Sequence, residues 1–404
     1  MGERLVIVGQ GMAATKLVEE LTARAPGCYE ITIIGAEHRF AYNRVLLSSL
    51  LAGEAQADEI ELKPRDWWAQ HGVTNIVGCA VTEIERSQRK VILANGTCLD
   101  YSKLVLATGS HPIRLAKPGM DLPGVITFRA MDDVEAMLEG VRPGRPAIVI
   151  GGGLLGLEAA YGLAKAGVKV TLVHLMDRLM ERQLDPSAAE LLRLAIESKG
   201  VRVLLDADTA RVIGTERAEG LELVDGRRFD ADLVVCAVGI RPNADLARAA
   251  ELDVERAILV DDRMTSSDPR IFAIGECAQH RGIAYGLVEP AYEQARVLAR
   301  HLMGDNFATY EGSTLATNLK VSGVSLFSAG DFIGEGKETI LFADERKGIY
   351  KKLVVDEDRL TGAVLYGDTS DGLWYLDLVR SKANIAAFRN DLVFGRQLAT
   401  QEAA

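Results

Sequence analysis

Residues 5–14 read LVIVGQGMAA, and residues 147–156 read AIVIGGGLLG. Each stretch leads from apolar residues of strand type into a glycine-rich turn, after which apolar residues recur at helical spacing. Another strand-type run follows in each copy, at residues 30–34 and 168–173. The order strand, glycine turn, helix and strand predicts a βαβ unit with two parallel strands. Because this order occurs twice, the sequence indicates the internal duplication of a large unit.

Both turns carry the pattern G-x-G-x-x-G/A, in which each small residue has a different task. The first glycine permits the tight turn, the second lets a diphosphate approach the backbone, and the third small residue lets helix and strand pack. The helix start then offers free N–H groups and the positive end of the helix dipole. One such turn alone is a weak signal, but two in the same context predict two dinucleotide sites, most simply one for FAD and one for NAD(P)H. The predicted contacts are Gly9, Gly11, Met12, Ala13 and Ala14 in the first turn and Gly151, Gly153, Leu154, Leu155 and Gly156 in the second.

Further strands that end in glycine follow each copy. They lie at residues 104–109 and 233–239, and a third one, at 271–276, has no duplicate. From about Thr314 the pattern changes to short strand-type runs and one helical stretch, which indicates a separate small unit. We therefore predict an α/β fold with two Rossmann-like, three-layer dinucleotide-binding domains and a small α+β C-terminal domain. The predicted boundaries are 1–114 with 246–312 for the FAD domain, 115–245 for the NAD(P)H domain and 313–404 for the C-terminal domain.

The composition limits the partners of the chain. Its 404 residues include 46 Lys and Arg and 57 Asp and Glu, which gives a formal net charge of −11. This acidic balance argues against nucleic acid and anionic membranes as partners. No apolar run approaches the ~18 residues that span a bilayer, and the first residues lack the basic-then-apolar order of an export signal. The sequence therefore predicts a cytoplasmic protein with no nucleic-acid or membrane partner.

The cysteines give no sign of a metal or cluster site. The five of them are far apart, and no C-x-x-C spacing occurs. Iron–sulfur and zinc-ribbon ligation both need such spacings. We therefore expect no metal and reduced, mostly buried thiols.

Five landmarks together resemble the two-dinucleotide flavoproteins, that is, the pyridine nucleotide–disulfide oxidoreductase-like superfamily. The landmarks are residues 9–14, 107–109, 151–156, 237–239 and 274–276, and they extend the resemblance over residues 1 to about 310. The resemblance implies FAD at the first turn and NAD(P)H at the second. It also implies an acid after the third glycine strand, usually an aspartate, that reaches the ribityl and diphosphate of the flavin. This chain has Glu276 there, which keeps the charge and lengthens the reach.

Longer motifs narrow the resemblance. Residues 41–48 (AYNRVLLS), 174–185 (HLMDRLMERQLD), 326–331 (LFSAGD) and 366–368 (YGD) are similar to segments of nitrite reductase large subunits and their relatives. The C-terminal part resembles the small domain of rubredoxin and nitrite reductases. Those large subunits continue into iron–sulfur and sirohaem regions, which this sequence does not contain. The resemblance therefore implies an electron-transfer subunit of an assimilatory nitrate or nitrite reductase, which passes electrons from NADH through FAD to an iron–sulfur partner.

Two other functions stay open. One is a free-standing rubredoxin or ferredoxin reductase, and the other is a flavin-bound interaction protein whose assembly responds to NADH. The partner is expected to be a nitrate or nitrite reductase catalytic subunit or a small iron–sulfur protein. We expect the C-terminal domain to receive it, with a homodimer interface as the alternative for that surface.

A reactive thiol is not expected in this chain. Disulfide reductases of the superfamily need a cysteine pair after the position of Tyr42, and peroxide-reducing members need one cysteine there. This chain has Asn43, Ser48 and Ser49 in that region, and Cys277 is expected to be a buried structural thiol. We therefore expect the flavin to carry the chemistry and no side chain to act as a catalytic base.

Several single residues are also predicted to contact the cofactors. Glu37 is expected to bond the adenosine ribose, with a solvated loop residue as the alternative. Arg44 and Arg129 match arginines that contact the flavin nucleotide in relatives, and for Arg44 a surface ion pair is the alternative. Glu158 is expected near the nicotinamide, or otherwise as an acid favoured by the helix dipole. The remaining predicted contacts are Asn43, Val81, Ala107, Thr108, Gly109, Gly239, Gly275 and Glu276.

The end of the second strand in copy two distinguishes NADH from NADPH. An acid at this place bonds the 2′-hydroxyl of NADH, whereas arginines accept the 2′-phosphate of NADPH. This chain has His174 there, with Asp177 and Arg178 nearby, so the pattern is ambiguous. The resemblance leads us to expect NADH.

Overall fold

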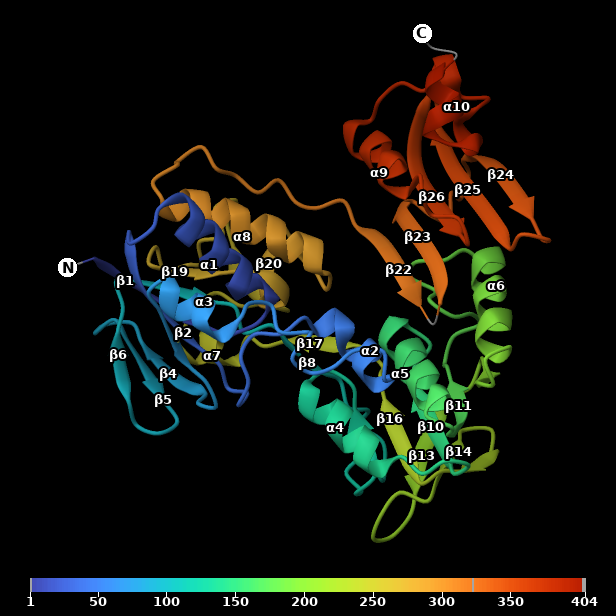
Figure 1. Cartoon of the computed structure of the whole chain (residues 1–404), viewed down its shortest axis with the longest axis horizontal. Helices are drawn as coiled ribbons and strands as arrows, with labels where there is room; N and C mark the ends of the chain where they lie inside the picture. Colours follow the sequence, from blue (N-terminus) through green and yellow to red (C-terminus); the bar gives the residue numbers. More distant parts are fainter. Residues whose placement is uncertain (1, 322, 402–404) are drawn as a thin grey trace. The chain divides into compact units, whose positions relative to one another are not determined.

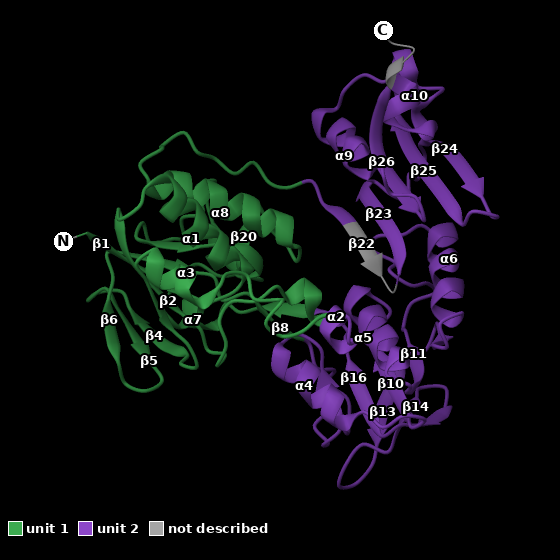
Figure 2. Cartoon of the chain, in the orientation of Figure 1, with its two compact units in different colours: residues 1–47, 55–112, 240–313 green, residues 48–54, 113–239, 314–404 purple. Residues whose placement is uncertain are grey.

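The computed structural model describes residues 2–321 and 323–401. The chain forms two compact units, drawn in different colours in Figure 2. Both units combine segments that lie far apart in the sequence. Unit 1 comprises residues 1–47, 55–112 and 240–313, and unit 2 comprises residues 48–54, 113–239 and 314–404.

A five-stranded parallel sheet forms the centre of unit 1 (Figure 1). In its register, Ile7 pairs with Ile33 on one side and with Val105 on the other. The inner strands are buried on both faces, as expected where layers cover a parallel sheet. In spatial order the strands are β19 (Ile271–Ala273), β7 (Lys103–Leu106), β1 (Glu3–Val8), β2 (Tyr29–Ile34) and β3 (Val73–Ile76).

Helices cover one face of this sheet, and smaller elements cover the other. Leu17 and Leu298, from two helices that lie side by side in Figure 1, pack with Ile7 and Ile33 on the first face. Val6 and its neighbours pack against an antiparallel layer on the second face. The three layers confirm the predicted class for this unit. The covering elements are α1 (Met12–Arg24), α3 (Arg65–Gln70), α7 (Asp245–Ala249), α8 (Val288–Leu302), β4 (Val81–Glu85), β5 (Lys90–Leu93) and β6 (Cys98–Asp100).

Unit 2 contains a second five-stranded parallel sheet with helices of its own. Ile148 of its central strand pairs with Thr171 and with Val234. In spatial order the strands are β12 (Arg202–Leu204), β11 (Lys169–Val173), β10 (Pro146–Ile150), β16 (Leu233–Cys236) and β9 (Val125–Thr127). The other elements of this half are α4 (Met131–Gly140), α5 (Leu154–Lys165), α6 (Pro186–Glu197), β13 (Thr209–Ile213), β14 (Gly220–Leu223) and β15 (Arg228–Asp230).

The two parallel sheets have the same strand order, which extends the duplication beyond the part that the sequence reveals. The order β3-β2-β1-β7-β19 corresponds to β12-β11-β10-β16-β9, and each sheet carries a three-stranded antiparallel insertion. The strand that ends before Gly275 therefore has a counterpart in β9. The sequence comparison misses this counterpart because β9 precedes the other strands of its sheet, whereas β19 follows the other strands of its own.

The C-terminal residues of unit 2 form an antiparallel five-stranded sheet with helices packed against it. Tyr375 and Leu376 of α9 pack with Phe327 and Leu365 of the sheet. The predicted strand and helix runs fall within β22, β25, β26 and α9, which confirms a small α+β unit, whereas β23 and the edge strand β24 were not predicted as strands. The elements are β22 (Ala316–Val321), β23 (Val324–Gly330), β26 (Arg359–Tyr366), β25 (Ile349–Asp356), β24 (Glu338–Asp344), α9 (Gly372–Ser381) and α10 (Arg396–Gln401).

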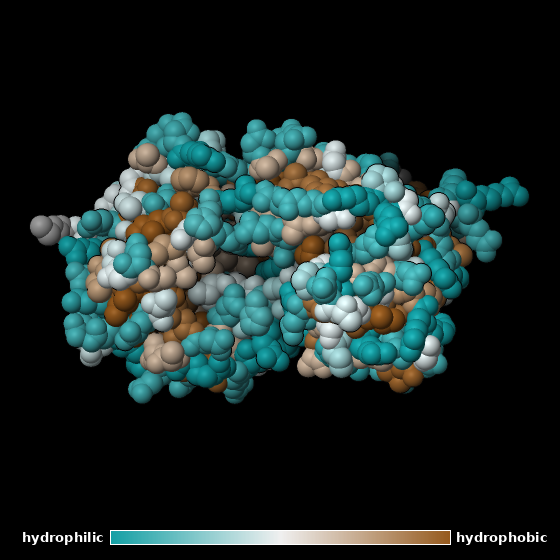
Figure 3. Space-filling model, turned by 90° about the horizontal axis from the view of Figure 1, so that it is seen from below, coloured by the Kyte–Doolittle hydropathy of each residue, from teal (hydrophilic) through white to brown (hydrophobic). Residues whose placement is uncertain are grey.

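Among the described residues, no helix is both long enough and apolar enough to cross a bilayer. The face drawn in Figure 3 is mostly hydrophilic, with apolar residues in small groups among the polar ones. This distribution agrees with the many charged residues of the sequence.

Candidate dinucleotide-binding sites

The turn after β1 is closed tightly against the neighbouring strand. Gly9 has φ +109°, a conformation that side-chain-bearing residues rarely adopt. Its N–H donates to the carbonyl oxygen of Ile34 at 2.8 Å. A Cβ at this position would overlap the carbonyl oxygen of Ala107. The fold therefore requires a glycine at position 9 whether or not a ligand binds at the turn.

Gly11, the second glycine of the turn, is placed differently. It is the N-cap of α1 with φ −105°, which any residue can adopt, and a Cβ there would meet no described atom within 4 Å. No described side chain caps this helix start, and the first helical bond runs from the Thr15 N–H to the Gly11 carbonyl oxygen at 3.0 Å. The N–H groups of Met12, Ala13 and Ala14 therefore have no carbonyl partner within the helix. Open space beside free donors is what a diphosphate needs.

The turn after β10 repeats this arrangement. Gly151 has φ +117°, and a Cβ there would overlap the carbonyl oxygen of Ala237. Gly153 is the N-cap of α5 with φ −81°, carries no cap from a described side chain, and has no described atom within 4 Å of a would-be Cβ. A Cβ on Gly156 would overlap the carbonyl oxygen of Gly151, whereas the first copy accommodates Ala14 at that position. Both turns therefore fit a dinucleotide diphosphate.

The two turns differ in which residue fills the space behind them. In unit 1 the side chain of Gln10 occupies the space where a Cβ on Gly35 would lie. In unit 2 the roles are exchanged, because the ring of His174 occupies the space where a Cβ on Gly152 would lie. His174 is only 8% exposed, and its Nδ1 accepts the N–H of Gly152 at 3.0 Å. His174 thus supports the second turn directly.

The structure brings together two residues that were predicted separately, Glu37 and Arg44. They form an ion pair, and the hydroxyl of Tyr42 donates to Glu37 Oε2 at 2.7 Å. Burial alone would lower the pKa of Arg44, but Tyr42, Glu37 and Glu276 act against it and raise the pKa above its usual value. Arg44 therefore stays positively charged near Glu276, the residue that is predicted to contact the ribityl chain.

Two other predicted FAD contacts have structural tasks of their own. Asn43 caps the short helix η1 (Arg44–Leu46), because its side-chain oxygen accepts the N–H of Val45 at 3.0 Å. Val81 is the first residue of β4 and pairs with Leu93. Both residues lie in unit 1 with the first turn.

The segments around Ala107 and Gly275 are held by three residues that sequence reasoning missed. The side chain of Asn243 donates to the carbonyl oxygen of Thr108 at 2.8 Å, and its N–H donates to that of Gly109 at 2.9 Å. Gln294 accepts the N–H of Gly275 at 2.7 Å, and Ser110 donates to Glu276 at 2.6 Å. Asn243 and Gln294 lie far in the sequence from the segments that they hold, so no local pattern could have identified them.

Unit 2 contains the predicted residues Arg129, Glu158 and Gly239. Arg129 follows β9, and its N–H donates to Asp133 at 2.7 Å. Glu158 lies in the second turn of α5, where burial raises its pKa to about 7, opposed by a hydrogen bond with Ser48. Gly239 has φ +119° just after β16. Burial thus places the pKa of the Glu158 carboxyl near neutral pH.

The described residues contain neither a disulfide nor a group of side chains that could hold a metal. All five cysteines are free, and no group of three or more His, Cys, Asp or Glu side chains could hold a metal. Cys277 is fully buried, and burial raises the pKa of its thiol. A raised pKa keeps the thiol protonated and unreactive.

Two glycine turns of this kind, each on its own parallel sheet, define the class of proteins that bind two dinucleotides. The pyridine nucleotide-disulphide oxidoreductase family matches residues 3–297, and the C-terminal domain of rubredoxin NAD+ reductases matches residues 316–383. The chain belongs to the pyridine nucleotide-disulphide oxidoreductase family, whose members bind FAD and NAD(P)H.

Individual relatives agree with this assignment. The chain is 46% identical to a nitrite reductase [NAD(P)H] of Bacillus subtilis over 388 residues, covering 96% of this chain and 48% of that protein. It is 41% identical to the assimilatory nitrate reductase electron transfer subunit of the same organism over 392 residues, covering 97% and 51%. The chain thus spans about half the length of these two relatives. The solved ferredoxin reductase of the CYP199A2 system from Rhodopseudomonas palustris superposes with a TM-score of 0.86 at 26% identity, covering 97% of this chain and 100% of that one.

Proposed function

We propose that the chain binds FAD at the turn of unit 1 and NADH at the turn of unit 2. In this proposal it passes electrons from NADH through FAD to an iron–sulfur partner. The observation that carries the proposal is the matched pair of Gly11 and Gly153, each of which begins a helix and faces open space. Unpartnered N–H groups and room for close approach are the two requirements of a bound diphosphate.

At the FAD site the glycine turn and the start of α1 hold the diphosphate. Glu37 accepts hydrogen bonds from the adenosine ribose, and Arg44 keeps this carboxylate oriented. Glu276, fixed by Ser110, accepts from the ribityl hydroxyls. The remaining proposed contacts are Asn43, Val81, Ala107, Thr108, Gly109 and Gly275, and the flavin contact of Arg129 stays a prediction from the resemblance.

At the NADH site the turn after β10 and the start of α5 hold the second diphosphate. Leu154 and Leu155 supply N–H groups at the helix start, and Gly156 lets α5 pack close to the turn. His174 supports Gly152 from behind. Glu158 and Gly239 are the proposed nicotinamide-side residues. With its pKa near 7, Glu158 holds or releases a proton at its carboxyl according to the pH.

The chemistry belongs to the cofactor. Bound FAD supplies a hydride acceptor that releases its electrons one at a time. The chain's own residues bind and orient both dinucleotides, and the inert Cys277 takes no part. Electron transfer of this kind needs no catalytic base from the protein.

The identity of the partner is supported by the relatives. The assimilatory nitrate reductase electron transfer subunit and the nitrite reductase both align over nearly all of this chain. We infer that the electrons go to nitrate or nitrite reduction in the cytoplasm. A free-standing rubredoxin or ferredoxin reductase is the second candidate, because the C-terminal domain matches that of rubredoxin NAD+ reductases and the fold matches a ferredoxin reductase.

The test is anaerobic reduction of the purified yellow protein by NADH. The reduced protein is then mixed separately with a nitrate or nitrite reductase catalytic subunit, a rubredoxin and a ferredoxin, and the rate of flavin reoxidation is measured. We expect fast reduction and fast reoxidation by the catalytic subunit. Fast reoxidation only by rubredoxin or ferredoxin would support the second candidate. Absence of flavin, or reduction too slow for turnover, would contradict electron transfer, and the latter would favour an NADH-responsive interaction protein.

A further inference from the structure

His174, which follows β11, uses both of its ring nitrogens for contacts within the protein. His174 Nδ1 accepts the Gly152 N–H, so this nitrogen carries no proton in the bonded state. The other nitrogen, Nε2, therefore carries the hydrogen and faces Glu181 Oε2 at 3.2 Å. With both ring nitrogens engaged, His174 has nothing left to offer a ribose. The position that usually supplies the ribose-binding acid thus supplies none here.

Glu181 is held at the same turn by the backbone as well. The N–H of Met180 donates to the carbonyl oxygen of Gly152 at 3.0 Å, and Leu184 N–H donates back to Met180 at 2.9 Å. Met180 adopts φ +50°, which is uncommon for a residue with a side chain. The segment is therefore bent so that Glu181 lies beside the turn, with its side chain 21% exposed. Its second oxygen, Oε1, lies 3.7 Å from Arg182 Nε, too far for a hydrogen bond.

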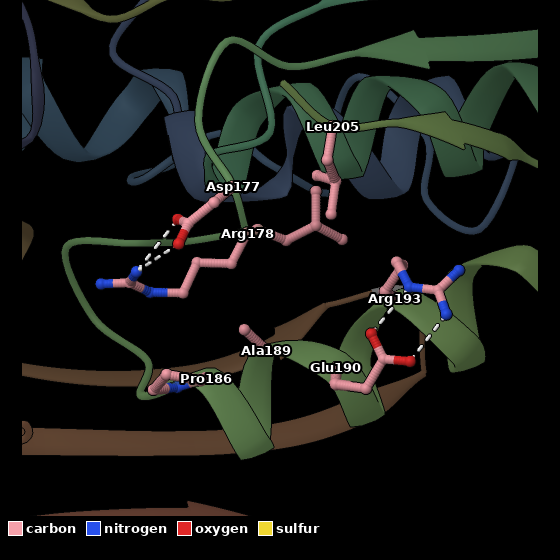
Figure 4. Close-up of a pocket in the computed structure, with 8 residues that line it drawn as sticks. Asp177, Arg178, Pro186, Ala189, Glu190, Arg193 and Leu205 are labelled. Atoms are coloured by element: carbon pink, nitrogen blue, oxygen red, sulfur yellow. Dashed lines mark hydrogen bonds and ion pairs between the residues drawn. The ribbon is translucent and has the colours of Figure 1, made fainter. Parts of the chain in front are cut away.

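Two of the arginines near this edge already have acidic partners of their own, and the third, Arg182, is 83% exposed and faces Glu181 itself. Arg178 donates to both oxygens of Asp177, and Arg193 donates to both oxygens of Glu190, as the dashed lines in Figure 4 mark. These two guanidinium groups line a cavity of about 110 Å³ between the segment after β11 and α6, which is too small for a nucleotide. A 2′-phosphate would therefore meet the Glu181 carboxylate, the exposed Arg182 that faces this carboxylate, and two arginines that already have acidic partners.

We propose that Glu181 is the residue that selects NADH over NADPH, and that His174 is its positioning residue. Glu181 accepts hydrogen bonds from the adenosine ribose hydroxyls and repels a 2′-phosphate by like charge. It replaces the acid that other dinucleotide sites carry at the strand end itself. Leu175 and Met176, which are 60% and 43% exposed, offer an apolar surface beside it for the adenine ring. The inference rests on the proposed second dinucleotide site.

The test measures binding of two fragments, ADP-ribose and 2′-phospho-ADP-ribose, to the purified full chain by titration calorimetry. Neither fragment can be oxidised or reduced, so the readout is independent of electron transfer. We expect the wild-type chain to prefer ADP-ribose by at least about tenfold, since a hydrogen bond to a charged group is worth that much or more. Glu181→Gln should reduce this ratio by about tenfold, and Glu181→Arg should bind 2′-phospho-ADP-ribose more tightly than the wild type does.

Three variants separate the alternatives. Glu190→Gln removes a neighbouring acid that pairs with Arg193 and should leave the ratio within about twofold, as the matched control. Asp177→Asn should behave in the same way, and a loss of preference in this variant alone would overturn the assignment to Glu181. His174→Phe should lower affinity for ADP-ribose, and loss of the preference with it would support the positioning role. A wild-type chain that binds neither fragment would refute the second site itself, whereas binding with an unchanged ratio in both Glu181 variants would refute only this inference.

Discussion

Tyr350 of β25 donates its hydroxyl hydrogen to Asp185 Oδ2 at 2.6 Å, and Asp185 is the residue that caps α6. Asp185 is 3% exposed, and its other oxygen accepts the Ala188 N–H at 3.2 Å. Lys352 Nζ lies 3.4 Å from the same carboxylate. Asp185 thus joins the C-terminal sheet to the segment that also carries Glu181. The C-terminal sheet and the start of α6 therefore share one buried carboxyl group.

Replacing Asp185 should destabilise unit 2. Asp185→Ala removes the cap of α6 and leaves the Tyr350 hydroxyl and the Lys352 ammonium group without their buried acceptor, so we expect a loss of about 2–4 kcal/mol in the free energy of unfolding. Tyr350→Phe removes one hydrogen bond and should cost about 1–2 kcal/mol. Urea denaturation measures both. Tyr366→Phe, which loses only a 3.3 Å bond to the Leu191 carbonyl oxygen, is the control and should cost less. An unchanged midpoint for Tyr350→Phe would show that this contact does not stabilise the unit.

The glycines of the second turn should separate ligand binding from folding. Gly153→Ala adds a methyl group to open space at φ −81°, so the fold should be unaffected while the NADH diphosphate is kept away. We expect the Kd for NADH to rise by about tenfold or more with an unchanged melting temperature. Gly151→Ala is the matched contrast, because its φ of +117° and the nearby Ala237 carbonyl should cost about 1–3 kcal/mol of stability. Unaltered NADH affinity in Gly153→Ala would mean that no diphosphate approaches this turn.

Glu158 should make the stability of the chain depend on pH. Burial raises the pKa of its carboxyl from 4.5 to about 7 in the folded state. Between these two pH values the folded state binds more protons than the unfolded state, so this group's contribution to stability falls as the pH rises from about 4.5 to 7. A shift of this size corresponds to at most about 3 kcal/mol.

Glu158→Gln should abolish that contribution. The difference in unfolding free energy between variant and wild type should therefore move in favour of the variant from pH 4.5 to pH 8, by up to about 3 kcal/mol. Denaturant titrations at both pH values measure this change. Comparing variant with wild type cancels the titration of all other groups that the substitution leaves alone. A constant difference across this range would place an ordinary, exposed carboxyl at position 158.

Much of the fold could be predicted because the decisive signals are local. Each glycine turn, with its strand before and its helix after, lies within about twenty residues, and the structure confirms both units there. The correspondence of β9 with β19 could not be predicted, since it depends on strand pairing across more than one hundred residues. The antiparallel insertions were not predicted either, because strands of three to five residues are too short to show a recognisable alternation of apolar and polar residues.

The candidate sites show the same division between local and distant information. The sequence pattern identified His174 as the position that distinguishes NADH from NADPH. It did not identify Glu181, the acid proposed to take over this task, because Glu181 reaches His174 only through the bend at Met180. Asn243 and Gln294 support the first site from segments that no motif connects to it. The site residues themselves stay predictions until a bound cofactor is measured.

The pairing of Glu37 with Arg44 allows a direct choice between two interpretations of Arg44. If the pair is only a surface ion pair, it is worth about 0–1 kcal/mol, and FAD is unaffected by its loss. If it belongs to the cofactor site, Arg44→Gln leaves Glu37 unsupported near the ribose and should raise the Kd for FAD by about tenfold or more, with part of the flavin lost on purification. Flavin-to-protein absorbance ratios and fluorescence titration of the apoprotein measure both quantities.

Arg65→Gln is the matched control for Arg44→Gln. Arg65 pairs with Glu61 at 3.5 Å in the same unit, but its side chain is 73% exposed, against 25% for Arg44. Removing it should change neither the flavin content nor the Kd, because an exposed ion pair contributes little. Glu37→Gln should resemble Arg44→Gln, and the double variant should cost less than the sum of the two single changes, since the residues act as one unit. Stoichiometric, equally tight FAD in Arg44→Gln would instead establish the surface ion pair.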